Sequence, residues 1–325
     1  MKKRYLITIE YDGKNYCGWQ RQSNGTSVQA VVEEKLSELF GGAVTLFGSG
    51  RTDAGVSAFA QTAHFDAETD IPNERLIHAI NFLLPRDIAV LDCRTVSDDF
   101  HARFNRKKKT YVYKIYVSPV RRPLFDRERL FVRKNLDLSA MKKAAEFMTG
   151  TYDCRCYEKA GSANGNPVKT IYSVSVLDFF WSGMIDTGRG TPNIGNGMVN
   201  IDSGTSDIGN GMLNIKNGTP NIESGMVNID SGTSGIGNGM LNMKNGMPNI
   251  GNGTSDIKCG TIDIEVAGSG FLYKMVRTMA GTLLYAGLGK LTPVDVLDAV
   301  KNCGKTKIGK TLPAEFLYLT KTEYF

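Results

Sequence analysis

The sequence predicts a mixed α+β fold made of two similar halves. Runs rich in β-branched and aromatic residues are separated by segments whose apolar residues recur at helical spacing. Over residues 1–105 these segments follow the order strand, helix, strand, strand, helix, strand. That order is typical of a ferredoxin-like half, with helices on one face of an antiparallel sheet. Residues 106–325 resemble the first half in element order, which indicates an internal duplication.

The first half has clear signals at the ends of its elements. Thr26 or Ser27 is a suitable N-cap for a helix, and Gly41 with the glycine after it ends that helix. Pro85 ends a second helix, because proline disfavours helical backbone in the residue before it. The expected elements are strands over 5–11, 44–47, 61–65 and 88–96 and helices over 28–40 and 73–83.

The second half is expected to begin with a strand that contains Tyr111 and Tyr113. Gly150 is a suitable end for a helix, and Pro293 is a suitable first residue for another. The expected elements are strands over 110–116, 168–180, 261–267 and 316–320 and helices over 139–150, 271–284 and 293–300.

Composition indicates a globular protein that is compatible with a nucleic-acid partner. The chain has 325 residues, of which 41% are hydrophobic and 22% charged, and its net charge is +6. No apolar run reaches the length of a membrane span, and the amino terminus leads into a strand without the apolar core of a signal peptide. We therefore expect a cytoplasmic protein that does not enter a membrane.

Cysteine and histidine spacing does not indicate a metal site. Six cysteines are scattered along the chain, and Cys154 and Cys156 form the one close pair. A single C-x-C pair does not complete a zinc site, and the three histidines lack ligand spacing. We expect reduced thiols and no bound metal.

An arginine and a carboxylate lie two residues apart in a glycine-rich run. Residues 47–56 read Phe-Gly-Ser-Gly-Arg-Thr-Asp-Ala-Gly-Val and include Arg51 and Asp53. The run follows a β-prone segment, so Asp53 is expected on a loop at the end of a strand, where reactive side chains often lie. The structural alternative is a surface turn in which Arg51 pairs with Asp53.

A basic cluster precedes the strand that holds Tyr111 and Tyr113. Residues 103–109 include two arginines and three lysines, and the two tyrosines share a face because side chains alternate along a strand. Positive groups can follow phosphates while an aromatic ring stacks on a base. The alternative is a solvated basic loop beside a strand whose tyrosines fill the core.

Residues 183–259 carry a seven-residue repeat rich in Gly, Asn and Ile. Each unit has strand-compatible residues followed by Asn-Gly or Ser-Gly, the pattern of a short strand and a hairpin turn. Pro192, Pro220 and Pro248 oppose a regular ladder. The pattern is compatible with a β-rich protrusion, either a meander or a β-solenoid, and with a flexible loop. In each case we expect an insertion in the second half that the function does not need.

Several motifs occur along the chain in a specific order. They are Tyr11-Asp12-Gly13, Gly-Trp-Gln-Arg-Gln over 18–22, Gly-Arg-Thr-Asp-Ala-Gly-Val over 50–56, residues 81–90, Asp-Phe-His-Ala-Arg-Phe over 99–104, and residues 270–277. Together they resemble the tRNA pseudouridine synthase A (TruA) family over nearly everything except the repeat. The resemblance implies two ferredoxin-like halves that form one continuous antiparallel sheet, with helices on one face and a basic catalytic cleft between the halves.

The resemblance also implies an activity, a pseudouridine synthase that isomerises uridine at positions 38–40 of the tRNA anticodon stem-loop. It implies a homodimer that binds the tRNA anticodon arm and uses no cofactor and no metal. Two alternatives stay open: a catalytically impaired RNA-binding paralogue, and a pseudouridine synthase that acts on another RNA.

Matching positions imply roles for single residues. Asp53 matches the catalytic aspartate of the family, as nucleophile or as base, and Arg51 matches the partner that would hold it as a carboxylate. Tyr111 matches the ring that packs on the target base, and Leu317 matches an apolar wall of the pocket. Phe316 stands where the family commonly has glycine. The other residues expected to bind substrate are Arg21, Arg103, Lys107, Lys108 and Arg277.

Overall fold

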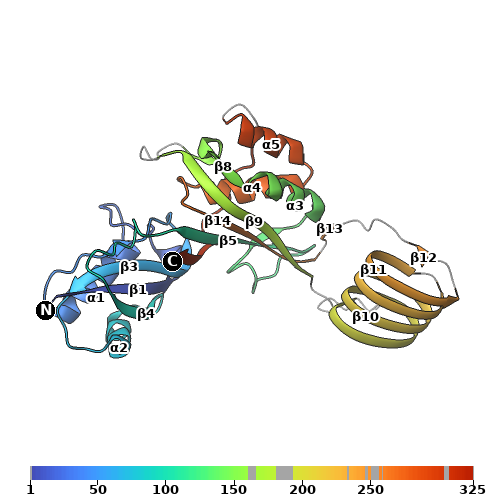
Figure 1. Ribbon diagram of the computed structural model, residues 1–325, viewed down its shortest axis with the longest axis horizontal. Coiled ribbons are helices and arrows are strands. Elements are labelled where there is room, and N and C mark those ends of the chain that lie inside the picture. Colours follow the sequence, from blue (N-terminus) through green and yellow to red (C-terminus); the bar gives the residue numbers. More distant parts are fainter. Residues whose placement is uncertain are drawn as a thin grey trace. The chain divides into compact units, whose positions relative to one another are not determined.

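The computed structural model of the chain (Figure 1) describes residues 2–159, 166–180, 193–232, 234–245, 248–249, 256–257, 259–303 and 307–324. The chain divides into two compact units. The first comprises Met1–Leu177 and Ile262–Phe325, and the second comprises Asp178–Thr261. Each unit is described by itself below.

The first unit contains both helices and strands, and its residues up to 105 and from 106 onward are called the N-terminal and C-terminal halves below. The elements of the N-terminal half are β1 (Lys3–Tyr11), α1 (Val28–Phe40), β2 (Phe47–Gly48), β3 (Ser57–Ala67), α2 (Asn73–Leu83) and β4 (Ile88–Val96). Those of the C-terminal half are β5 (Lys108–Val117), β6 (Leu130–Val132), β7 (Leu136–Asp137), α3 (Leu138–Phe147), β8 (Gly150–Asp153), β9 (Val168–Phe180), β14 (Gly260–Gly268), α4 (Met275–Gly287), α5 (Pro293–Lys301) and β15 (Leu317–Glu323).

One large sheet runs through both halves. Its described strands follow the order β4-β1-β3-β15-β5-β14-β9-β8, with β2 added to β3 and β6 added to β5. Most of the described pairings are antiparallel, which confirms the predicted α+β class. The halves join where β15 pairs with β3, and this junction is parallel, with Tyr318 opposite Ser57. Strand β15, the one nearest the carboxyl terminus, therefore joins the strands of the two halves into one sheet.

The helices form two groups along this sheet. Figure 1 shows α1 and α2 beside β1, β3 and β4, and α3, α4 and α5 together beside β9 and β14. On α1, the side chains of Val28, Val32 and Leu36 are completely buried. Ser27 caps this helix through a bond from Ala30 N, and its carboxyl end has Gly41 in the left-handed region at φ 65°. Local capping and an apolar stripe thus account for this helix at the bounds that the sequence predicts.

The sequence also predicts α2, β4 and β9 at their observed bounds, whereas other element ends differ. Helix α4 begins at Met275 rather than at Phe271, because Lys274 adopts the left-handed region at φ 59° and cannot continue a helix. Helix α3 ends at Phe147, and Gly150, at φ 125°, begins β8 instead of ending the helix. The predicted strand over 44–47 is reduced to Phe47–Gly48.

The second unit contains β10 (Asn193–Gly232), β11 (Ser234–Asn245), β12 (Pro248–Asn249) and β13 (Asp256–Ile257). Strand β10 pairs with β11 in parallel, with Ile222 opposite Ile236 and Met226 opposite Met240. Each pair is offset by two of the seven-residue units seen in the sequence. Parallel pairing at a fixed repeat offset is the geometry of a solenoid, and Figure 1 shows β10 and β11 as stacked, curved ribbons. The described residues therefore form a β-rich structure and not a meander of antiparallel hairpins.

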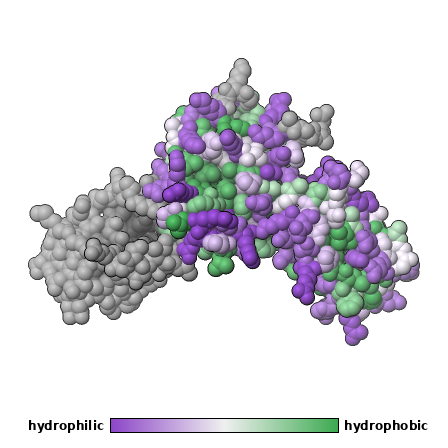
Figure 2. Space-filling model, turned by 180° about the vertical axis from the view of Figure 1, so that it is seen from behind, coloured by the Kyte–Doolittle hydropathy of each residue, from purple (hydrophilic) through white to green (hydrophobic). Residues whose placement is uncertain are grey.

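The surface of the first unit has an apolar region. Seen from behind, apolar residues gather in the middle of the C-terminal half and are bordered by hydrophilic ones (Figure 2). Strand β9 exposes the side chains of Val168, Tyr172 and Leu177. Among the described helices, none combines the length and apolar character needed to cross a bilayer.

Candidate active site

The loop between β2 and β3, which carries Asp53, is tied to the sheet at its beginning. Ser49 N donates to the carbonyl of Thr62 at 2.8 Å, and Gln61 Nε2 donates to the carbonyl of Gly50 at 2.7 Å. The Ser49 hydroxyl also bonds the Gln61 side chain at 3.0 Å. The loop therefore starts from a fixed backbone on the central part of the sheet.

The middle of this loop lies against the segment that follows β1. The hydroxyls of Tyr11 and Thr52 lie 2.8 Å apart, and Trp19 N donates to the Thr52 carbonyl at 3.3 Å. Gly18 has φ 103°, and a Cβ on it would lie 2.6 Å from the Thr52 carbonyl oxygen. Glycine is required there because backbone meets backbone. These contacts explain why the motifs near residues 11 and 18 accompany the Asp53 loop.

An arginine from the other half of the fold contacts Asp53. Arg277 lies in the first turn of α4, and its Nη1 donates to Asp53 Oδ2 at 3.1 Å. The same guanidinium donates through Nε to the carbonyl of Leu312 at 2.7 Å. The Arg277 side chain is 13% exposed and the Asp53 side chain is 21% exposed. The carboxylate is therefore oriented by a mostly buried cation.

Arg51 does not make the contact that the sequence predicts. Its Nε donates to Gln20 Oε1 at 2.5 Å, and the residue is exposed. The expected Arg51–Asp53 pair is replaced by the Arg277–Asp53 pair, because the guanidinium from α4 bonds the Asp53 carboxylate while the Arg51 guanidinium bonds Gln20. Arg51 thus lies in the loop but bonds to the neighbouring motif.

Tyr111 lies on β5 and is buried close to this pair. Its ring contacts Phe271 edge to face, with centroids 5.3 Å apart and planes at 87°. Burial raises the pKa of the Tyr111 hydroxyl, and the charge of Asp53 raises it further. The structure therefore brings Asp53, Arg277 and Tyr111 together from a loop, a helix and a strand.

Leu317 is the first residue of β15, the strand that joins the halves, and Phe316 directly precedes it. Leu317 is buried and pairs in register with Tyr113, the second tyrosine of β5. Phe316 is also buried, and its carbonyl accepts a bond from Lys114 N at 3.0 Å. Both apolar side chains thus belong to the packed junction between β5 and β15.

The other basic residues predicted to bind substrate fall into two classes. Arg21 and Lys108 form ion pairs with Glu33 and Glu323, at 3.1 Å and 3.2 Å. Arg103 and Lys107 are exposed at the surface of the loop before β5. Of the predicted basic residues, Arg277 is the one that contacts Asp53.

Arg106 and Lys109 belong to the basic cluster that the sequence leaves open as a phosphate-binding segment or a solvated loop, and neither is among the predicted substrate-binding residues. Arg106 Nη1 donates to the Ser49 carbonyl at 2.6 Å, and Lys109 is buried at 3% exposure. The alternation of β5 was the available signal, because Lys109 shares a strand face with Tyr111. Phe271 was also missed, since the sequence placed it inside a helix.

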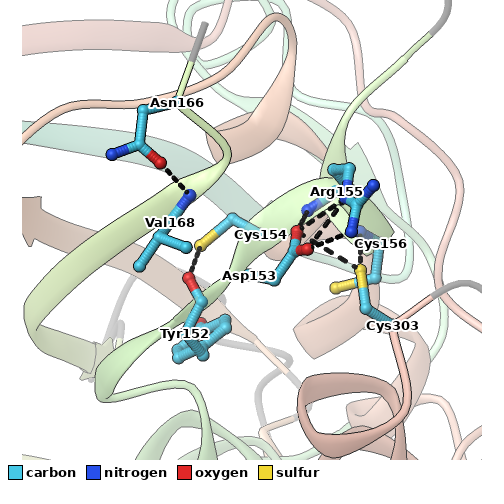
Figure 3. A network of polar contacts seen from close by, with 8 residues as sticks. All are labelled: Tyr152, Asp153, Cys154, Arg155, Cys156, Asn166, Val168 and Cys303. Carbon is cyan, nitrogen blue, oxygen red and sulfur yellow. Dashed lines mark hydrogen bonds and ion pairs between the residues drawn. The ribbon is translucent and has the colours of Figure 1, made fainter.

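The cysteines near residue 155 form a structural cluster (Figure 3). Cys156 N donates to Cys303 Sγ at 2.8 Å, and Asp153 bonds the guanidinium of Arg155. Cys154, Cys156 and Cys303 take part in no disulfide, and burial raises the pKa of Cys154 to about 12. Thiols with raised pKa values stay protonated and are poor ligands and nucleophiles. Within the described ranges, no cluster of His, Cys, Asp and Glu could hold a metal ion.

A carboxylate that is oriented by arginine beside a buried aromatic ring can act as a nucleophile or as a base. A family model described as tRNA pseudouridine synthase matches residues 7–105 and 144–324 of this chain. The chain belongs to the tRNA pseudouridine synthase family. This membership confirms the predicted enzyme class, a pseudouridine synthase, which is an isomerase.

Individual relatives in this pseudouridine synthase family match along nearly all of their length. A tRNA pseudouridine synthase A of Syntrophotalea carbinolica is 44% identical over 318 residues, which cover 98% of this chain and 95% of the relative. One of Ruminiclostridium cellulolyticum is 32% identical over 322 residues, covering 99% of this chain and all of the relative. A tRNA pseudouridine synthase A 2 of Clostridium tetani is 30% identical over 326 residues, covering both chains completely.

Proposed function

We propose that this pseudouridine synthase isomerises uridine at positions 38–40 in the anticodon stem-loop of tRNA, with Asp53 as the catalytic residue. The observation that carries the proposal is the Arg277–Asp53 ion pair beside the buried ring of Tyr111. The relatives named tRNA pseudouridine synthase A support tRNA as the substrate. The motifs that resemble the TruA family support the anticodon arm.

The reaction needs no atoms from outside the substrate. The bond from ribose C1′ to uracil N1 breaks, the base turns, and a bond forms from C1′ to C5. The hydrogen leaves C5, and N1 gains one, so the change is an isomerisation. Asp53 is assigned either attack on the uridine as a nucleophile or removal of a proton from the sugar as a base.

Single side chains have separate roles in this proposal. Arg277 orients the Asp53 carboxylate, and Tyr111 packs on the uracil once the nucleotide has left the stack. Leaving the stack costs about a few kcal/mol, and stacking on an aromatic ring offsets about 1–3 kcal/mol. Leu317 lines the apolar side of the site. Arg51 and the remaining predicted basic residues bind the RNA backbone: Arg21, Arg103, Lys107 and Lys108.

The test is to incubate the purified protein with unmodified tRNA and map pseudouridine by position. The wild-type protein is expected to modify positions 38–40. Asp53→Asn is expected to form no product while RNA affinity stays within about threefold, because the change removes a charge that the RNA phosphates do not need. Asp70→Asn, an exposed aspartate before α2, is the matched control and should keep full activity.

Other results would identify the alternatives. Tight, salt-sensitive tRNA binding without product would indicate a catalytically impaired RNA-binding paralogue. Product in another RNA but not in tRNA would indicate a different substrate. Full turnover by Asp53→Asn would disprove the assignment of the catalytic residue.

The repeat is proposed to be an insertion at 183–259 that interrupts a C-terminal half at 106–325, which follows an N-terminal half at 1–105. Support comes from the sheet, in which β9 and β14 are neighbours although the repeat separates them in sequence. A turn could join these two strands directly. Deleting residues 190–252 should leave the turnover number within about twofold and the melting temperature of the first unit unchanged. A loss of activity with retained folding would assign the repeat a functional role.

The protein is further proposed to be a cytoplasmic homodimer. Exposed apolar side chains on β9, those of Val168, Tyr172 and Leu177, support a contact between copies. Sedimentation equilibrium is expected to give twice the chain mass. A monomer at micromolar concentration would contradict the dimer without affecting the reaction.

A further inference from the structure

Two positive side chains lie together beside the loop that carries Asp53. Nζ of Lys109 lies 2.9 Å from the position that a Cβ would take on Gly50, and Nη1 of Arg106 lies 3.3 Å from the same point. Both cations therefore lie beside the backbone of Gly50, three residues before Asp53. Within the described part of the chain, neither forms an ion pair with a carboxylate.

Arg106 is fixed in place by both halves of the fold. Its Nη1 donates to the Ser49 carbonyl at 2.6 Å, and its Nη2 donates to the Ser269 carbonyl at 3.0 Å. Its Nε is buried and has no hydrogen-bond partner among the described residues. Gly270 permits this approach, because a Cβ there would lie 3.3 Å from Nη2. The guanidinium is thus positioned by carbonyl groups while its charge is not neutralised.

Lys109 is held in an unfavourable environment. It is 3% exposed, and burial together with the charge of Arg106 lowers its pKa to about 7. Two carboxylates of the neighbouring segments have other partners, since Asp53 bonds Arg277 and Glu323 bonds Lys108 and Lys321. Two neighbouring cations without a counter-charge form a site that an anion would complete.

The position of the pair indicates which anion it would bind. Lys109 and Tyr111 share one face of β5, so the lysine lies on the same strand face as the ring assigned to the target base, and Arg106 lies in the loop that leads into this strand. Arginine and lysine together bind phosphate oxygens well, the first by its planar fork and the second as a compact charge. Because both cations lie beside Gly50, a phosphate bound to them is next to the loop that carries Asp53.

We propose that Arg106 and Lys109 form a binding site for one backbone phosphate of the RNA, within two nucleotides of the target uridine. The proposal rests on the proposed function, because it takes RNA as the substrate. The phosphate replaces the missing counter-charge and fixes the target nucleotide relative to Asp53. Arg106 and Lys109 are positioning residues and do not contact the reacting atoms.

The experiment is a coupling measurement between one side chain and one phosphate. Anticodon-arm RNAs are prepared with a single neutral methylphosphonate linkage at each position around the target uridine. Affinity and single-turnover rate are measured for wild type, Lys109→Met and Lys143→Met. Lys143 is exposed on α3, so its substitution removes the same charge away from the site.

Lys109→Met is expected to weaken binding of the unmodified RNA by about 10- to 100-fold. A methylphosphonate at one position near the target uridine should weaken RNA binding by the wild-type protein by a similar factor. The same RNA should bind Lys109→Met as tightly as the unmodified RNA does. Lys143→Met should respond to every linkage as wild type does. For Lys109→Met, the slope of the logarithm of the RNA-binding constant against the logarithm of the salt concentration should also be smaller by about one.

Two results would overturn the proposal in different ways. If wild type forms pseudouridine but Lys109→Met stays sensitive to every linkage, or couples only to a remote one, the phosphate site is wrong and the proposed function stands. If wild type neither binds nor modifies the RNA, the proposed function fails and the site fails with it. Lys109→Gln, which keeps a polar side chain, gives the same readout if the methionine variant does not fold.

Discussion

Arg277 and Asp53 are 224 positions apart in the sequence, and Arg277 Nη1 lies 3.1 Å from Asp53 Oδ2. The aspartate comes from the loop between β2 and β3, and the arginine comes from the first turn of α4. Their contact depends on β15, which pairs with β3 of one half and β5 of the other. The candidate site therefore exists only when both halves of the fold are assembled.

Arg277→Lys should lower the single-turnover rate of pseudouridine formation by about 100-fold. A lysine ammonium is a single point charge and cannot bond both the Leu312 carbonyl and the Asp53 carboxylate, as the guanidinium does. Arg51→Gln is the comparison, and its rate should fall less than about tenfold, because Arg51 bonds Gln20. Equal losses for the two variants would contradict the assignment of Arg277 as the residue that orients Asp53.

Tyr111→Phe should retain the rate within about tenfold and leave the melting temperature nearly unchanged. The ring keeps its edge-to-face contact with Phe271, and the lost hydroxyl has no hydrogen-bond partner among the described residues. Tyr111→Ala should destabilise the fold by about 3–5 kcal/mol, because it removes a buried ring. Thermal unfolding and single-turnover kinetics on both variants separate packing from chemistry. A larger loss in the phenylalanine variant would assign the hydroxyl a catalytic role.

Lys109→Met should stabilise the protein at pH 7 by about 1–3 kcal/mol while it weakens RNA binding. The pKa of Lys109 is lowered to about 7 from its ordinary 10.5, so the unfolded chain binds more protons between these values. Wild-type stability is therefore expected to rise with pH across this window, and the variant should lack that rise. Denaturant unfolding at several pH values measures both. Lys143→Met should change stability by less than about 0.5 kcal/mol. A destabilised methionine variant would mean that the lysine has a structural role.

His64 should make the fold sensitive to mild acid. Burial, aided by the charges of His101 and Arg4, lowers the pKa of His64 to about 4 from its ordinary 6.5. The unfolded chain binds more protons between those values, so stability falls as pH decreases from 6.5 toward 4, by roughly 1–3 kcal/mol. His64→Gln should reduce this fall. His78→Gln, on the exposed side of α2, should not, and an unchanged pH profile for the His64 variant would assign the acid sensitivity to other groups.

Local signals in the sequence predict most elements of this fold. The Ser27 cap and Gly41 end define α1, and an apolar stripe with a following proline defines α2, because these features act within a few residues of the backbone they order. The prediction fails at α4, where Lys274 is left-handed and Phe271 faces Tyr111 instead of joining the helix. A tertiary contact overrides helix periodicity there.

The candidate site follows the same division. Glycines and motif order identify the Asp53 loop, but Arg51 is the cation nearest to Asp53 in sequence and Arg277 is the one that contacts it in space. Lys109 reads as a surface lysine until β5 is placed between β15 and β14. Burial of a charged residue depends on neighbours from distant segments, and single-residue composition does not contain that information.

The sequence by itself determined the element types, the seven-residue period of the repeat and the loop that holds Asp53, because each depends on backbone preferences and spacing within a short window. The tertiary structure alone decided that residues paired between the parallel strands of the repeat are two repeat units apart in sequence. It also decided that β15 joins the halves and that Arg277 is the partner of Asp53. Register and side-chain contacts across long separations depend on which strands pair, and strand pairing depends on the whole folded chain.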